Sequence, residues 1–266
     1  MTGVQTCALP ISDEELHHFE REGFLLVREL LDWERDLRPV WEEYGEVLDR
    51  LIDDLIASGE MTSRHEGLPC GKRMTQAYRE SGRILSQYFD CSLPQQGTRE
   101  DSPIWVGPEV FRALSNETLL DVGEDLIGPE SFSNPVQHIR IKPPQDALPE
   151  NRRDPKTGYL GGFDAGVTPW HQDNGVVLPD ADETNMLTDW FPPTPATCEN
   201  GCLKIITRSH LSGLLHHCPG VSGLNVPDTF LDLDSELVVP MEAVDVLFLN
   251  RRTLHSSLPR SEEHRS

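Results

Sequence analysis

The stretch Val246-Leu247-Phe248-Leu249-Asn250 is an apolar run with the length of a buried β-strand. Further short strands are predicted at 136–142, 167–171, 186–191, 203–206, 237–239 and 253–256, with turn residues between them. The first half differs, because its apolar residues recur at helical spacing in 33–57, 74–89 and 108–127. An earlier helix begins with a capping box at Ser12 and ends at Gly23. A helical first half followed by short strands indicates an α+β fold with a mainly β core.

Three residues near two of the predicted strands form a candidate metal site. His171 and Asp173 are two residues apart, so on a strand their side chains point to the same side of the sheet. His255 follows the apolar run and could close the set from a distant strand. Two imidazoles and one carboxylate on one face of an ion are the ligand set of mononuclear non-haem Fe(II). The alternative is a solvated His-x-Asp pair without a metal.

The residues around these three carry a family resemblance. Four motifs keep a consistent order: Pro169-Trp170-His171-Gln172-Asp173, Glu199-Asn200-Gly201-Cys202-Leu203, Ser209-His210, and Asp245-Val246-Leu247-Phe248 before His255. Together with the opening stretch from Phe19 to Asp32, they resemble the phytanoyl-CoA dioxygenase family of Fe(II)/2-oxoglutarate oxygenases. The resemblance implies a double-stranded β-helix, a jelly-roll or cupin-like barrel, flanked by N-terminal helices.

The resemblance also implies a function. Fe(II) would be held by His171, Asp173 and His255, with 2-oxoglutarate as cosubstrate and O2 as oxidant. The expected reaction is hydroxylation of a small organic molecule with release of succinate and CO2. A carboxylate at Asp173 favours hydroxylation, since a related halogenase has a small residue there and binds chloride instead.

Five residues are candidates for contacts with the cosubstrate. Trp190, Ser257 and His138 occupy positions that contact 2-oxoglutarate in the family, and Arg140 is predicted to share a strand face with His138. Trp190 could instead be a core aromatic residue, Ser257 could serve only backbone groups, and Arg140 could reach solvent. The family places an arginine about eleven residues after the distal histidine, and the nearest here is Arg265. Val244 also departs from a common family glycine, which would strain the turn if it needs a positive φ.

The two ends of the chain resemble translated sequencing adapter. Ala8-Leu9-Pro10-Ile11-Ser12 and Arg260-Ser261-Glu262-Glu263-His264 can be encoded by the two complementary strands of one short oligonucleotide. We therefore expect one oxygenase domain over 13–259, truncated at its C-terminus, between adapter-derived tails at 1–12 and 260–266. Arg265 lies in the second tail, so the true arginine could have been lost.

The composition of the chain limits the classes of partner that it is expected to bind. The chain has 266 residues, a formal net charge of −22 and six cysteines without the spacing of a disulfide framework. Such an acidic chain is not expected to bind nucleic acid or an anionic membrane. The cysteine usage fits a reducing cytosol, so we predict a cytoplasmic enzyme with a small-molecule substrate. No apolar run has membrane-spanning length. The oligomeric state is left open.

Two other functions fit the same residues. A zinc-dependent hydrolase could use two histidines and a carboxylate. A catalytically impaired or inactive barrel fragment could act as a binding module. A second metal site at His216-His217 is not expected, because adjacent residues on a strand face opposite ways.

Overall fold

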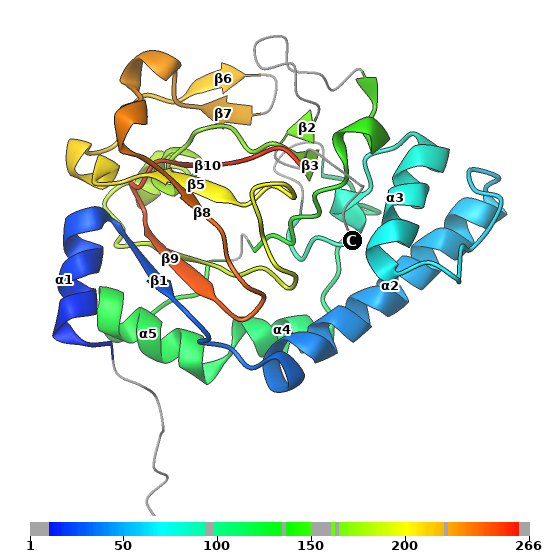
Figure 1. Cartoon of the computed structure of the whole chain (residues 1–266), viewed down its shortest axis with the longest axis horizontal. Coiled ribbons are helices and arrows are strands. Elements are labelled where there is room, and N and C mark those ends of the chain that lie inside the picture. Colours follow the sequence, from blue (N-terminus) through cyan, green and yellow to red (C-terminus); the bar gives the residue numbers. More distant parts are fainter. Residues whose placement is uncertain are drawn as a thin grey trace, which may run out of the picture.

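The structure is a computed structural model that describes residues 11–93, 98–134, 137–150, 161–162, 165–220 and 223–260. The helices in these ranges are α1 (Asp13–Glu22), α2 (Arg38–Ala57), α3 (Cys70–Ser81), α4 (Pro108–Leu114) and α5 (Glu117–Ile127). The strands are β1 (Phe24–Val27), β2 (Gly161–Gly162), β3 (Ala165–Gly166), β4 (Leu187–Trp190), β5 (Leu203–Ile206), β6 (Cys218–Gly220), β7 (Gly223–Asn225), β8 (Glu236–Val239), β9 (Val246–Asn250) and β10 (His255–Ser257). The predicted combination of N-terminal helices with a later β core is confirmed (Figure 1).

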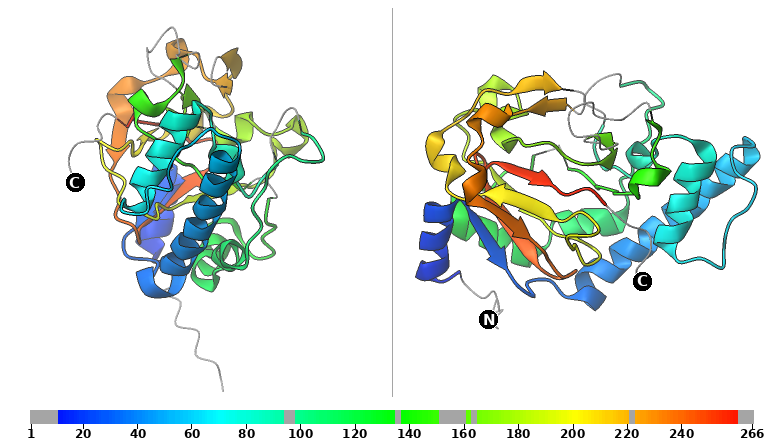
Figure 2. Two further views of the ribbon diagram at one scale, coloured as in Figure 1. Left: turned by 90° about the vertical axis from the view of Figure 1, so that its right-hand side faces the viewer. Right: turned by 45° about the horizontal axis from the view of Figure 1, so that its top comes forward.

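Two three-stranded antiparallel sheets form the β core. One has the order β1-β9-β4 and the other the order β10-β5-β8. Leu247 and Leu249 of β9 join Leu203 and Ile205 of β5 in one buried cluster, so the sheets pack against each other through these faces. Figure 2 shows the second sheet in its right-hand view, with β5 (yellow) between β10 (red) and β8 (orange). These antiparallel sheets are the observed β core, and the double-stranded β-helix, or jelly roll, stays a prediction.

The other face of the first sheet is covered by helices. Val246 and Phe248 alternate with Leu247 and Leu249 along β9 and pack in a second cluster with residues of α1 and α5, including Phe19 and Leu119. Successive side chains on a strand point to opposite faces, so a strand covered on both sides is apolar throughout. This explains the uninterrupted apolar run at 246–249.

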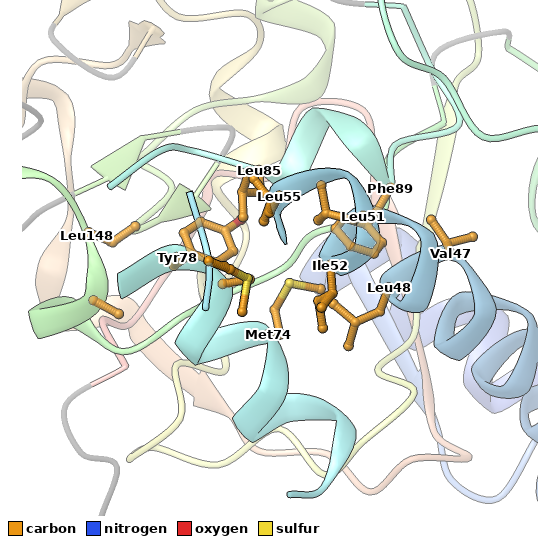
Figure 3. Packing of buried hydrophobic residues seen from close by; sticks show 13 residues of the cluster. Val47, Leu48, Leu51, Ile52, Leu55, Met74, Tyr78, Leu85, Phe89 and Leu148 are labelled. Atoms are coloured by element: carbon orange, nitrogen blue, oxygen red, sulfur yellow. The ribbon is translucent and has the colours of Figure 1, made fainter. Parts of the chain in front are cut away.

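The helices α2 and α3 form a separate layer at the opposite end from α1 (Figures 1 and 2). Figure 3 shows their side chains meeting, with Leu48, Leu51 and Ile52 of α2 opposite Met74 and Tyr78 of α3. The cluster is almost entirely inaccessible to solvent. It supports the fold from outside the sheets and contributes none of the predicted metal ligands.

Several sequence predictions differ from the structure. The predicted helix at 108–127 is two helices, because Asn116 caps a new helix by accepting from the amides of Thr118 and Leu119. The break changes the helical phase, and the apolar side chains of Phe111 and Leu120 are exposed. The helix predicted at 74–89 begins earlier and is α3, 70–81.

The strand predicted at 136–142 is wrong for the described residues, since 137–142 pair with no neighbouring strand. Pro143-Pro144 follows at once, and the polar groups of His138 and Lys142 bind other segments instead of a neighbouring strand.

The backbone strain expected at Val244, if its turn needed a positive φ, does not occur. Among the described non-glycine residues, positive φ occurs at Glu29, His65, Glu130 and Arg208, so Val244 is compatible with its turn.

No helix in the described part of the chain is long and apolar enough to cross a membrane. The domain limits 13–259 and the cytoplasmic location stay predictions.

Candidate metal centre

His171 and His255 are direct partners across two antiparallel segments. The amide of His171 donates to the carbonyl of His255 at 3.1 Å, and the amide of His255 donates to the carbonyl of His171 at 3.0 Å. The rings lie on the same side with centroids 4.2 Å apart. Because β10 also pairs with β5, at His255↔Ile205, the histidines are fixed on the edge of the second sheet. The expectation that two distant segments bring the histidines together is met.

The hydrogen bonds of the two imidazoles define their tautomers. In each ring Nδ1 faces a backbone carbonyl two residues earlier, Pro169 O at 2.9 Å for His171 and Thr253 O at 3.1 Å for His255. A carbonyl can only accept, so Nδ1 carries the proton in both rings. In a neutral imidazole with this tautomer, Nε2 carries the lone pair that a metal would bind. A hydrogen bond from Nδ1 to a backbone carbonyl is what orients metal-binding histidines.

Asp173 completes the cluster from a turn. Gln172 is extended, so Asp173 faces the same side as His171, as predicted, but it begins a 3₁₀ turn, Asp173–Gly175, and lies outside any strand. Its Oδ1 lies 3.5 Å from Nε2 of both His171 and His255. Its Oδ2 accepts a 2.6 Å hydrogen bond from the hydroxyl of Thr188 on β4. One carboxylate oxygen is thus held by the protein, and the other faces both imidazoles.

Burial and charge set the protonation of this cluster. Burial lowers the pKa of His255 to about 4, so its ring is neutral near pH 7, as a metal ligand must be. Burial alone would raise the pKa of Asp173. Both imidazoles and the Thr188 hydroxyl outweigh it and hold that pKa well below the usual range. The site therefore presents a carboxylate and a neutral imidazole of His255 at neutral pH.

The three ligand atoms lie within 4.8 Å of one another, and no other group of at least three His, Cys, Asp or Glu side chains in the described residues meets this criterion. Both histidines are buried and Asp173 is partly exposed. Two imidazole nitrogens and one carboxylate oxygen fit a divalent ion such as Fe(II) or Zn²⁺. The site could hold a metal ion and leave part of its coordination sphere open.

Two of the candidates for cosubstrate contacts lie on elements next to the ligands. Ser257 follows His255 by two residues on β10 and is buried, and its Oγ accepts from the amide of Thr168 at 2.9 Å. Trp190 follows Thr188 by two residues on β4, so both face the same side of that strand. It is partly buried against the core between the two sheets. Trp190 therefore has a packing role, whether or not it contacts a cosubstrate.

The remaining candidates are not brought to the site by any described contact. The Nδ1 of His138 lies 2.8 Å from Oδ2 of Asp90, and Arg140 is exposed. The expected shared strand face of His138 and Arg140 is not formed, because the described residues 137–142 form no strand. Arg265 lies outside the described residues. Sequence reasoning did not single out Thr188, because a threonine in a strand carries no motif of its own.

A two-histidine, one-carboxylate cluster beside an antiparallel β core is the site type of non-haem iron oxygenases. The family model described as phytanoyl-CoA dioxygenase (PhyH) matches residues 154–266, which include all three ligand candidates. This match, over less than half of the chain, agrees with the resemblance found in the sequence and with the predicted class, a 2-oxoglutarate-dependent non-haem iron enzyme.

The solved structures that are similar to this chain include the following three. The epimerase SnoN, in complex with Fe3+, alpha ketoglutarate and nogalamycin RO, is 16% identical over 95% of this chain and 78% of that chain, with a TM-score of 0.49. EvdO2 from Micromonospora carbonacea var. aurantiaca, complexed with 2-oxoglutarate, is 16% identical over 94% and 85%, with a TM-score of 0.49. The carbocyclase SnoK from nogalamycin biosynthesis is 13% identical over 98% and 83%, with a TM-score of 0.48. No curated protein matches the sequence.

Proposed function

We propose that this protein hydroxylates a small organic molecule in a reaction that depends on Fe(II), 2-oxoglutarate and O2 and releases succinate and CO2. The observation that carries the proposal is that Nε2 of His171, Nε2 of His255 and one oxygen of Asp173 all lie within 4.8 Å of one another. The family match over residues 154–266 supports it. His171, Asp173 and His255 are the proposed metal ligands.

The chain's own residues would orient the reactants. When bound, Fe(II) would supply the activation of O2 coupled to decarboxylation of 2-oxoglutarate. The carbonyls of Pro169 and Thr253 keep Nδ1 protonated and Nε2 available in both histidines. Asp173 fills the position that a halide would need, which favours hydroxylation.

The cosubstrate would lie along β10 and β4. Ser257 Oγ accepts from the Thr168 amide, so its hydroxyl proton can be donated to a carboxylate. Trp190 would provide an apolar wall beside it. Roles for His138, Arg140 and Arg265 belong to the same proposal, with Arg265 as the cation for the distal carboxylate, since a buried unpaired charge is costly.

The test is anaerobic loading of the purified protein with Fe(II), followed by addition of 2-oxoglutarate and then O2. We expect a metal-to-ligand absorption band on addition of 2-oxoglutarate, and succinate after O2 is admitted. Asp173→Ala and His255→Ala should abolish both signals, while His216→Phe, at an exposed histidine outside the cluster, should retain both. The band needs no substrate, so it reports on the site even when the substrate is unknown.

Two results would overturn the proposal. The first is metal binding without the band and without succinate, which would indicate a binding module. The second is Zn²⁺-dependent hydrolysis that 2-oxoglutarate does not affect.

A further inference from the structure

We infer that His217 is a positioning residue for the turn that carries the metal ligands. The inference rests on the proposed function, because it assumes that His171 and Asp173 bind a metal. His217 lies in the segment 213–217, between the 3₁₀ turn Ser209–Ser212 and β6, and is distant in sequence from every ligand. It is partly buried, whereas its neighbour His216 is exposed.

The first contact is a hydrogen bond to the backbone between two ligands. The amide of Gln172 donates to Nε2 of His217 at 3.0 Å, and Nδ1 of His217 lies 2.9 Å from the carbonyl of Leu215. Since a carbonyl only accepts, Nδ1 must carry the proton and Nε2 must be the acceptor. The ring thus connects the backbone between His171 and Asp173 to the segment 213–217.

The second contact is steric. A Cβ added to Gly175 would collide with three atoms of the His217 ring, so the imidazole lies directly against the backbone of the turn Asp173–Gly175. The φ of Gly175 is not positive. The glycine is therefore needed for the close approach of the ring and not for its backbone conformation.

The Gln172 side chain anchors the same turn. It is fully buried, and its amide nitrogen donates to Gly213 O at 2.9 Å and to Arg252 O at 2.6 Å. Its Oε1 accepts from the amide of Leu215 at 2.7 Å. Gln172 alternates with the ligands, so it faces away from the metal site and toward the segment 213–217. Together with His217, it fixes the turn from behind.

The consequence is a predicted effect on metal affinity without contact to the metal. Loss of the Nε2 acceptor would leave the Gln172 amide without its partner and allow Asp173 to move relative to the two histidines. Residues that orient metal ligands typically change metal affinity by about 10- to 100-fold when they are replaced.

The experiment compares Co(II) binding by the purified protein and by its variants, measured by the visible absorption of Co(II) and by calorimetry. His217→Phe keeps an aromatic ring against Gly175 but removes the acceptor, and we expect about a 10-fold or greater loss of affinity with an altered spectrum. His217→Gln restores an acceptor oxygen and should recover most of the affinity. His216→Phe, at the adjacent exposed residue, should bind Co(II) as the unaltered protein does.

The outcomes separate this inference from the proposed function. Unaltered protein that binds no Co(II), with His255→Ala indistinguishable from it, would contradict the metal centre itself. Tight binding by unaltered protein and equal binding by His217→Phe would overturn the role of His217 alone. If His217→Phe does not fold, Gly175→Ala replaces it, because the added methyl group displaces the ring while its nitrogens remain. Unchanged Co(II) affinity in that variant would equally overturn the inference.

Discussion

Thr188 Oγ1 donates to Asp173 Oδ2 at 2.6 Å, while Asp173 Oδ1 lies 3.5 Å from Nε2 of both His171 and His255. The two oxygens of one carboxylate therefore have different partners. One is held by a strand of the first sheet, and the other is available to a metal between the histidines of the second. Thr188 links the first sheet to the turn that carries Asp173 and favours binding of the metal through a single oxygen.

Replacing Thr188 with valine keeps the shape of the side chain and removes the hydroxyl. We expect Thr188→Val to weaken metal affinity by about 10-fold, because Asp173 loses the donor that orients it. Thr188→Ser, which keeps the hydroxyl, is the matched control and should bind metal nearly normally. Isothermal titration with Co(II) measures the difference. Equal affinity in the valine and serine variants would show that the hydrogen bond does not position the ligand.

Asp245 is expected to be the main acid-sensitive residue at the start of β9. Its carboxylate accepts from the amides of Glu29 at 3.0 Å and Glu242 at 2.8 Å, and pairs with Arg28 at 2.6 Å. Burial opposes ionisation, but these partners lower the pKa of Asp245 below its usual range. A carboxyl with a lowered folded-state pKa stabilises the fold above its unfolded pKa, near 3.8, and loses this contribution as pH falls through the lower folded value.

Asp245→Ala should therefore lower the free energy of unfolding at pH 7 by roughly 2–4 kcal/mol, since buried donors lose their acceptor. The difference from the unaltered protein should shrink below about pH 4. Asp101→Ala is the control, because Asp101 forms an exposed ion pair with Arg99. Urea unfolding at several pH values provides the measurement. A loss in Asp101→Ala as large as in Asp245→Ala would contradict this account.

Gly23 ends α1 with a φ of +84°, and an added Cβ would collide with the ring of His210 and the hydroxyl of Thr253. Gly59 has a similar φ of +79° but open space around the position of a Cβ. In both alanine variants the left-handed backbone conformation should lower the free energy of unfolding by about 1–2 kcal/mol. Gly23→Ala should lose more stability than Gly59→Ala, because the added methyl group would displace His210, whose Nε2 contacts Glu20 O at 3.0 Å. Thermal unfolding compares the two, and equal losses would exclude the steric contribution.

The strands β4, β5, β8, β9 and β10 and the meeting of the three candidate ligands were predictable, because each depends on local pattern. The strand predicted at 167–171 is reduced to an isolated bridge at His171. The apolar run at 246–249 is covered on both faces, and the limits of β5 agree with the predicted 203–206. His171 and Asp173 could be recognised together because the backbone is extended through Gln172. The sequence also indicated the end of α1 at Gly23, since a left-handed cap strongly favours glycine.

The supporting contacts were not predictable, because they join segments far apart in sequence. Thr188 on β4 contacts Asp173, which is 15 residues earlier in the chain, and His217 contacts Gln172, which is 45 residues earlier. Neither residue type carries a local signature for such a contact. The break at Asn116 was missed for a different reason, since apolar spacing alone does not reveal where the phase of a helix changes.

Lys142 connects the two motif regions that flank the site. Its ammonium nitrogen donates to the carbonyls of Gly201 at 2.9 Å and Leu258 at 2.7 Å, and burial lowers its pKa to about 7 from the usual 10.5. Between these two values the unfolded chain binds a proton that the folded chain does not, so stability must rise with pH in this window. Below about pH 7 Lys142 is protonated in both the folded and the unfolded protein, so the cost of burying its charge lowers the free energy of unfolding in full.

We expect the free energy of unfolding to increase from pH 7 to pH 10 more steeply in the unaltered protein than in Lys142→Met, which has no titrating group at this position. The comparison of slopes is needed because Cys91 and Cys202, whose pKa values burial raises to about 11, act in the opposite direction. These cysteines are present in both proteins, so their contribution cancels to first order. Lys142→Met should also be less stable overall, since two carbonyls lose their donor. Parallel slopes in urea unfolding across this pH range would show that Lys142 stays charged in the folded protein.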